Sequence, residues 1–160
     1  MSESLEVMWP RARAWLERVR RAAHQIEPLT REIRGLEEAR DEMLPWWRKS
    51  SGTSHGHSTH SDPTASEAER RIAELGELID AKRQELGVMQ DVVGALLCVL
   101  DAMGDALTVR HARAIELYYI DCAPTWTDVA WEMECGRTTL WKLRLEAYAW
   151  IETRCQKNLV

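Results

Sequence analysis

The 160-residue chain contains no phenylalanine, and it has only eight glycines and five prolines. All-β folds depend on β-branched and aromatic strands divided by frequent turns, so this composition argues against an all-β fold. No apolar stretch approaches the roughly 20 residues of a transmembrane helix, and the N-terminal residues lack the apolar core of a signal peptide. The sequence therefore predicts a soluble, cytosolic protein.

Motifs for catalysis and for metal binding are also scarce. The chain lacks the phosphate-binding GxxxxGKS/T loop, the GxSxG nucleophile elbow and the HExxH zinc motif, so we expect neither an enzyme nor a cofactor. His55, His57 and His60 would bind zinc only if their segment folded around the ion, and no fourth ligand is evident. We expect a solvated loop there. No CxxC pair, as in a zinc ribbon or a redox motif, occurs among the four cysteines, which are Cys98, Cys122, Cys135 and Cys155.

Two long segments do carry a strong pattern, in which apolar residues recur every three or four positions. An average step of 3.5 residues is the seam period of a coiled coil, so the sequence predicts a long antiparallel helical hairpin. Arg40 and Lys82 fill the vacant seam positions, where we expect them to set the register. The seam residues are Trp15, Val19, Ala22, Ile26, Leu29, Ile33, Leu36, Met43 and Trp47, and then Ala68, Ile72, Leu75, Ile79, Leu86, Met89, Val93, Leu96, Leu100, Met103 and Leu107.

The hairpin has a predicted loop, a predicted register and one predicted irregularity. Residues 50–65 are rich in Ser, Gly, Thr and His and favour a flexible loop, after which Ser66 and Glu69 have the spacing of a capping box. Matching the two seams places Trp47 near Ala68, Ile33 near Lys82, and Trp15 near Leu100. Pro28 removes a backbone hydrogen bond, so a kink or a break is expected there. Because its core is thin, the hairpin should either dock on the C-terminal unit or dimerise.

From Thr108 the pattern changes to three short helices, and the segment from Trp126 to Leu145 has the spacing of a helix-turn-helix. The turn falls at Glu134, Cys135 and Gly136. Glu134 occupies the position that usually holds a glycine, because the backbone there is left-handed. The second helix of such a motif lies in the major groove of DNA. The expected core of the motif is Val129, Ala130, Met133, Leu140 and Leu143.

This segment, IELYYIDCAPTWTDVAWEMECGRTTLWKLRLEAYAWI, resembles the fourth conserved region of sigma-70 family factors. The loop SSGTSHGHSTHSDPT and the arm REIRGLEEARDEM extend the likeness to a family of small phage and prophage proteins of Gram-positive bacteria. Members of that family pair such a unit with an N-terminal helical hairpin, and many have no assigned function. The resemblance implies a phage late-transcription regulator in the cytoplasm of a bacterial host. It is carried by Leu117, Tyr119, Trp126, Val129, Ala130, Arg137, Thr138, Thr139 and Leu140.

The residues that would contact DNA follow from the helical geometry. The chain is acidic overall, at −5, but residues 137–160 carry five Arg or Lys against two Asp or Glu, which indicates a localised anionic contact. The predicted DNA-binding residues are Arg137, Thr138, Trp141, Lys142, Arg144 and Leu145. Further phosphate contacts are expected from Arg110, Arg113, Arg154 and Lys157.

The sequence thus predicts an all-α protein with a hairpin over residues 1–107 and a sigma-like DNA-binding unit over residues 108–160. Double-stranded DNA is the expected partner, RNA polymerase or a second copy of the chain would bind the hairpin, and no membrane is involved. Two alternatives stay open. A small terminase-like DNA-packaging subunit would form a ring in solution, and a protein-only polymerase adaptor would not need the cations of the second helix.

Overall fold

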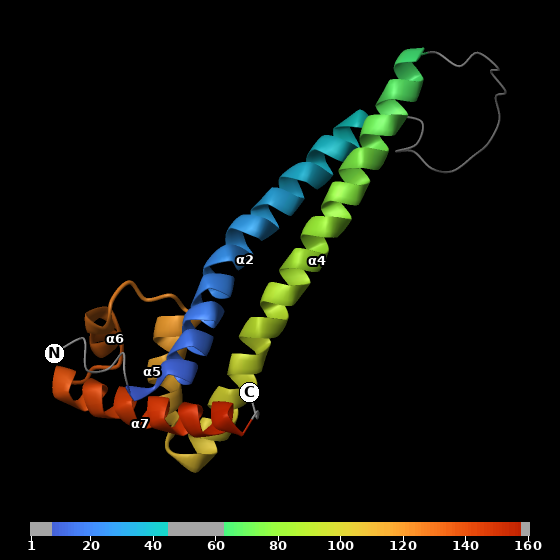
Figure 1. The fold of residues 1–160 in the computed structure, drawn as a ribbon. Helices are drawn as coiled ribbons and strands as arrows, with labels where there is room; N and C mark the ends of the chain where they lie inside the picture. The colour runs from blue at the N-terminus through green and yellow to red at the C-terminus, as the bar shows by residue number, and fades with distance from the viewer. Residues whose placement is uncertain (1–7, 45–62, 158–160) are drawn as a thin grey trace. The chain divides into compact units, whose positions relative to one another are not determined.

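A computed structural model describes residues 8–44 and 63–157 of the chain. The predicted all-α fold is confirmed, because these residues form helices and no strand. The helices are α2 (Pro10–Met43), α4 (Pro63–Ala106), α5 (Val109–Tyr119), α6 (Trp126–Glu132) and α7 (Arg137–Gln156) (Figure 1).

Contacts divide the described residues into two compact units. The core unit combines the residues up to Glu27 with those from Val88 onward, and the arm unit is Pro28–Gly87. Each unit therefore contains part of α2 and part of α4. The boundary expected from the sequence, between residues 107 and 108, does not coincide with this division.

The arm unit pairs the second part of α2 with the first part of α4. Leu29, Ile33 and Ile79 are buried between them. Lys82 Nζ lies 3.3 Å from Glu32 Oε1, and Arg83 pairs with Glu37. These pairs agree with the predicted register that places Ile33 near Lys82. Exposed ion pairs contribute only about 0–1 kcal/mol each, so they specify the register more than they stabilise it.

Three local predictions about the hairpin have different outcomes. Of the kink or break expected at Pro28, the break is wrong, since α2 continues through this residue, and the kink stays a prediction. Pro28 and His24 are both exposed, so water can bind the carbonyl that loses its donor. The capping box at Ser66 does not start the second helix, because α4 begins three residues earlier, at Pro63, and proline is favoured in a first turn. Trp47 and the three loop histidines lie outside the described residues.

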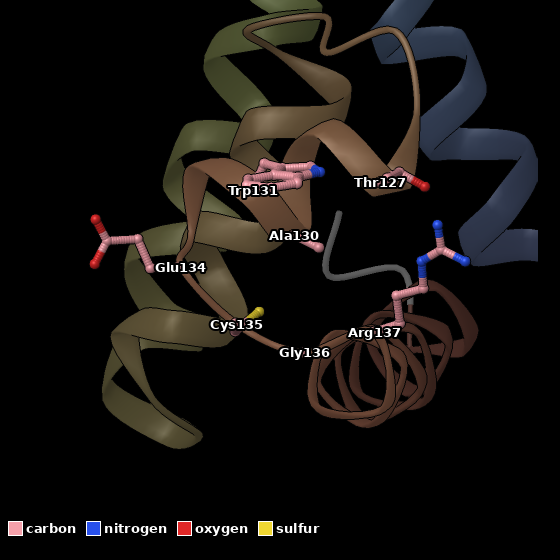
Figure 2. A pocket seen from close by; sticks show the side chains of 7 residues that line it. All are labelled: Thr127, Ala130, Trp131, Glu134, Cys135, Gly136 and Arg137. Atoms are coloured by element: carbon pink, nitrogen blue, oxygen red, sulfur yellow. The ribbon is translucent and has the colours of Figure 1, made fainter.

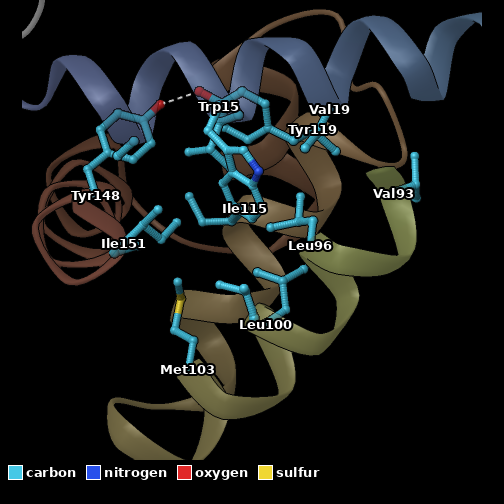
Figure 3. Packing of buried hydrophobic residues seen from close by; sticks show 14 of the residues in the cluster. Trp15, Val19, Val93, Leu96, Leu100, Met103, Ile115, Tyr119, Tyr148 and Ile151 are labelled. Atoms are coloured by element: carbon cyan, nitrogen blue, oxygen red, sulfur yellow. Dashed lines mark hydrogen bonds between the residues drawn. The ribbon is translucent and has the colours of Figure 1, made fainter. Parts of the chain in front are cut away.

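The core unit is built around one apolar cluster to which four helices contribute (Figure 3). Trp15 of α2 and Leu100 of α4 both belong to it, as the register predicted. Helices α5 and α7 complete it, so these parts of the long helices dock on the C-terminal helices. The buried members are Ala12, Trp15, Leu16, Val19, Ala22, Val93, Leu96, Val99, Leu100, Met103, Ile115, Tyr119, Ala147, Tyr148 and Ile151.

Helix α4 departs from the expectation that no segment could span a membrane. Among the described helices it alone, over Ser66–Ala106, is long and apolar enough to do so by length and composition. The core helix of a soluble protein meets the same criterion. Val93, Leu96, Leu100 and Met103 of this helix are buried in the core unit, so length and composition do not by themselves assign it to a membrane.

Candidate nucleic-acid interface

Helix α5 precedes the helix-turn-helix and α6 begins it, and the first turns of these two helices are stabilised differently. Thr108 precedes α5, and its Oγ1 lies 2.7 Å from Nδ1 of His111. Helix α6 starts with a reciprocal capping box, in which Asp128 N–H donates to Thr125 Oγ1 over 3.2 Å and Thr125 N–H donates to Asp128 Oδ2 over 2.8 Å. The Thr-x-x-Asp spacing indicates this box, which was not among the sequence predictions.

The packing of α6 against α7 follows most of the predicted core. Val129, Ala130 and Leu140 are buried in one cluster with Ala114 and Leu117 of α5. Because α5 supplies part of this cluster, the three short helices support one another. Of the other two predicted core residues, Met133 is half-buried and packs against the cluster, whereas Leu143 is half-buried and lies outside it.

The turn between α6 and α7 has the expected left-handed residue. Glu134 has a φ of 48°, and its N–H donates to the carbonyl of Trp131 over 3.1 Å. The N–H of Cys135 donates to the carbonyl of Ala130 over 3.0 Å. Gly136 has a φ of −70° and a ψ of 152°, so it needs no left-handed conformation and serves as the N-cap of α7.

The N-terminus of α7 is open to solvent-borne anions. Its N-cap, Gly136, provides no side chain to accept hydrogen bonds from the first-turn amides, and no acidic residue occurs in that turn. The positive end of the helix dipole and the side chain of Arg137 therefore lie together, and the first turn of α7 contains no carboxylate to compensate them. This arrangement favours a phosphate or a base acceptor at the start of the helix.

Helix α7 is exposed at its beginning and buried near its end. Arg137, Thr138 and Lys142 are exposed, and 39% of the surface of Trp141 is accessible. With the half-buried Leu145, they fall within an arc of about 140° on the helix, at 3.6 residues per turn. Further along α7, Ala147, Tyr148, Ile151 and Glu152 are buried. The four exposed residues of the predicted DNA-binding set thus lie in the first two turns of α7.

Arg144 differs from the other residues of the predicted DNA-binding set. Its Nε donates to the hydroxyl of Tyr148 over 3.1 Å, and its guanidinium carbon lies 4.4 Å from the ring centre of Trp126 and 5.8 Å from that of Trp141. The side chain is half-buried. The guanidinium of Arg144 therefore interacts with aromatic side chains of the same chain.

Four residues outside this arc were also expected to contact phosphates, and two of them interact with other side chains of the protein instead. Arg113 pairs with Glu116 and Asp121, and the hydrogen bond that it donates to the Glu116 carboxylate raises the pKa of the guanidinium. The guanidinium of Arg154 lies over the ring of Trp150. Arg110 and Lys157 are exposed.

Glu146 is an acidic residue that directly follows Leu145, the last residue of the arc. Its Oε2 lies 2.7 Å from Nε2 of His111, which is buried on α5. The carboxylate is therefore tied to the supporting helix, which keeps it oriented toward α5.

A cavity of about 620 Å³ lies beside the turn, between α6 and the start of α7. Figure 2 shows the indole of Trp131 and the guanidinium of Arg137 on different walls, while Glu134 points away. Trp131 is 79% exposed, and it was not among the predicted site residues. Helical spacing could have found it, because Trp131 falls on the side of α6 opposite to Val129.

Comparison with known proteins adds no relative, since no family model, no curated protein and no solved structure matches the chain. Among the described residues, no group of His, Cys, Asp and Glu side chains is arranged to bind a metal ion. What the candidate interface can bind is therefore inferred from the contacts and the exposure of its residues.

Proposed function

We propose that the protein is a sequence-specific DNA-binding transcriptional regulator that reads the major groove with the first turns of α7. One observation carries the proposal. The second helix of a packed helix-turn-helix presents Arg137, Thr138, Trp141 and Lys142 on one exposed face, at a helix N-terminus that has no side-chain cap hydrogen bond. This is the face and the helix end that such motifs direct at base edges and phosphates.

The chemistry of the face suits specific recognition more than tight non-specific binding. Arg137 can donate two hydrogen bonds to a guanine edge, which contributes about 1–3 kcal/mol of discrimination. The amides of the first turn and Lys142 are suited to phosphates. Since the chain has a net charge of −5, few phosphates would be neutralised, and two cationic contacts predict a salt slope of only about −2 in log–log form.

The biological setting of the proposal rests on the sequence resemblance alone. A sigma-like unit of a phage or prophage protein would act at promoters, with late genes as the implied targets. The hairpin would then contact RNA polymerase or a second copy of the chain.

Selection of bound fragments from the protein's own genome tests the proposal. We expect full-length wild-type protein to enrich a promoter-like site, and the folded Arg137→Ala/Lys142→Ala variant to lose that enrichment. Matched controls are Arg70→Ala/Arg71→Ala, which remove two exposed cations of α4. Equal enrichment by the wild type and the Arg137→Ala/Lys142→Ala variant, or no enrichment at all, would refute the proposal.

A protein-only adaptor is the second candidate, and the cavity beside Trp131 favours it. An indole that is 79% exposed, at the edge of a cavity of about 620 Å³, is a group that commonly anchors protein partners. If the protein is such an adaptor, Trp131→Ala would abolish its effect on transcription in cells, whereas Arg137→Ala/Lys142→Ala would leave that effect intact.

A further inference from the structure

Four side chains from four helices of the core unit form a continuous stack. The guanidinium carbon of Arg20, on α2, lies 3.8 Å from the ring centre of Tyr118 on α5. Tyr118 stacks on Trp126, the first residue of α6, with the ring centres 4.1 Å apart and the planes 13° from parallel. On α7, the guanidinium carbon of Arg144 lies 4.4 Å from the ring centre of Trp126.

The order of the stack follows from its spacing. A gap of 4.1 Å between two rings leaves no room for a planar cation, so each arginine must lie on the outer face of its ring. The sequence of layers is therefore Arg20, Tyr118, Trp126, Arg144. Each ring presents its negative face to a cation, and this is the favourable geometry for an arginine on an aromatic side chain.

Hydrogen bonds fasten both ends of the stack. At one end, Nη2 of Arg20 donates to the carbonyl of Ala123, in the connection between α5 and α6, over 3.0 Å. At the other, Nε of Arg144 donates to the hydroxyl of Tyr148, which lies 2.5 Å from the hydroxyl of Tyr119 in the buried core. A planar guanidinium can stack and donate at the same time, which an ammonium cannot do in the same geometry.

We propose that Arg144 and Arg20 are positioning residues that set the orientation of the helix-turn-helix, and that neither contacts DNA. The stack connects the first turn of α6 to the middle of α7, and both of them to α2. It also holds Arg144 beside Trp141 of the exposed face, 5.8 Å from that ring. This inference rests on the proposed DNA-binding function, and it reassigns Arg144 from the predicted contacts to the support of the interface.

An arginine that contacts phosphate and an arginine that only positions other side chains affect the salt dependence of DNA affinity differently. Losing a phosphate contact lowers affinity for all sequences and reduces the salt slope by about 1. Losing a positioning residue leaves the number of phosphate contacts unchanged but misplaces the side chains that read bases. We therefore expect Arg144→Met to reduce the preference for the selected site over random DNA about tenfold or more, with an unchanged slope.

The experiment measures binding of the selected site and of random DNA at several salt concentrations for Arg144→Met, Arg144→Lys and Arg20→Met. Lys142→Met is the matched control, since it removes an exposed cation from the same helix, and its slope should fall by about 1. Arg20→Met should have the same signature as Arg144→Met, although it lies on another helix. Arg144→Lys should not restore specificity.

A measurement without DNA separates this inference from the proposed function. The indole N–H resonance of Trp126, assigned with Trp126→Phe, should shift in Arg144→Met and in Arg20→Met and stay in place in Lys142→Met. If Arg144→Met lowers the salt slope by about 1 and leaves the resonance unmoved, the positioning role is overturned. If wild-type protein binds no DNA, the proposed function fails, and an unmoved resonance would still overturn the stack as the support of α6 and α7.

Discussion

At the scale of single residues, Glu134, in the turn between α6 and α7, has a backbone conformation that is unfavourable for a residue with a side chain. Its φ of 48° lies in the left-handed region, where a Cβ atom is strained and glycine is not. We expect Glu134→Gly to raise the free energy of unfolding by about 0.5–1 kcal/mol, measured by urea denaturation.

A control for this substitution is Glu132→Gly, in the last turn of α6. Glu132 is also exposed, but it is the last residue of α6 and has no positive φ, so glycine there should lower stability, by up to about 1 kcal/mol. A loss of stability in Glu134→Gly as large as in the control would contradict the strain that we assign to the turn.

Tyr119 and Tyr148 share a buried hydrogen bond of 2.5 Å between their hydroxyls. Burial raises the pKa of both groups in the folded protein, above the value of about 10 of an unfolded chain. Their contribution to stability is therefore complete below pH 10, and it is lost as the pH rises further, because only the unfolded chain releases these protons.

The expected pH dependence can be measured directly. The free energy of unfolding should fall above pH 10, by at most about 1.4 kcal/mol per pH unit for each group while that group stays protonated in the folded protein. Tyr119→Phe should make this fall less steep and, by removing the hydrogen bond, should cost about 1 kcal/mol at neutral pH. A fall equally steep in Tyr119→Phe would show that Tyr119 is not the group responsible.

At the scale of elements, Glu152 of α7 links the interface to the long helix α2. Its Oε2 accepts a hydrogen bond of 2.7 Å from the N–H of Ala12, in the first turn of α2, and the residue is only 8% exposed. A carboxylate at this end of a helix also interacts favourably with the helix dipole. Helix α7 thus has an exposed face in its first turns and, near its other end, supplies a cap for another helix.

Glu152→Ala should lower the free energy of unfolding by about 1–3 kcal/mol, because it leaves a buried amide without an acceptor. Glu152→Gln keeps an acceptor and should cost less. Urea denaturation gives the energies, and hydrogen exchange at the Ala12 amide locates the effect. If that amide exchanges no faster in Glu152→Ala, the cap is not what the substitution removed.

Local sequence signals predicted these elements in part. Apolar periodicity and turn spacing were enough for α5, α6 and α7 and for the register of Ile33 against Lys82. The outcome at Pro28 was not predictable, because the cost of a lost hydrogen bond depends on whether water can replace it. Helical spacing places Arg144 at the edge of the exposed face, but it does not reveal that the ring of Trp126, from another helix, lies 4.4 Å from its guanidinium carbon in the folded unit.

At the scale of the whole molecule, charge and packing divide the chain into regions with different tasks. Residues 137–160 are locally basic within a chain of net charge −5, and two of their exposed cations, Arg137 and Lys142, lie in the first two turns of α7. The remaining Arg side chains near the interface are largely engaged by carboxylates or rings. Such a distribution favours a small specific contact, in which the loss of one side chain affects one base pair.

The most direct test of the account compares the base preferences of wild-type protein and Arg137→Ala at each position of the selected DNA site. The account predicts that preference at one base pair, a guanine read by Arg137, falls by an amount equivalent to about 1–3 kcal/mol, while the other positions keep their preferences. A uniform loss of affinity across all positions, or unchanged preferences, would contradict the claim that the first turns of α7 read DNA.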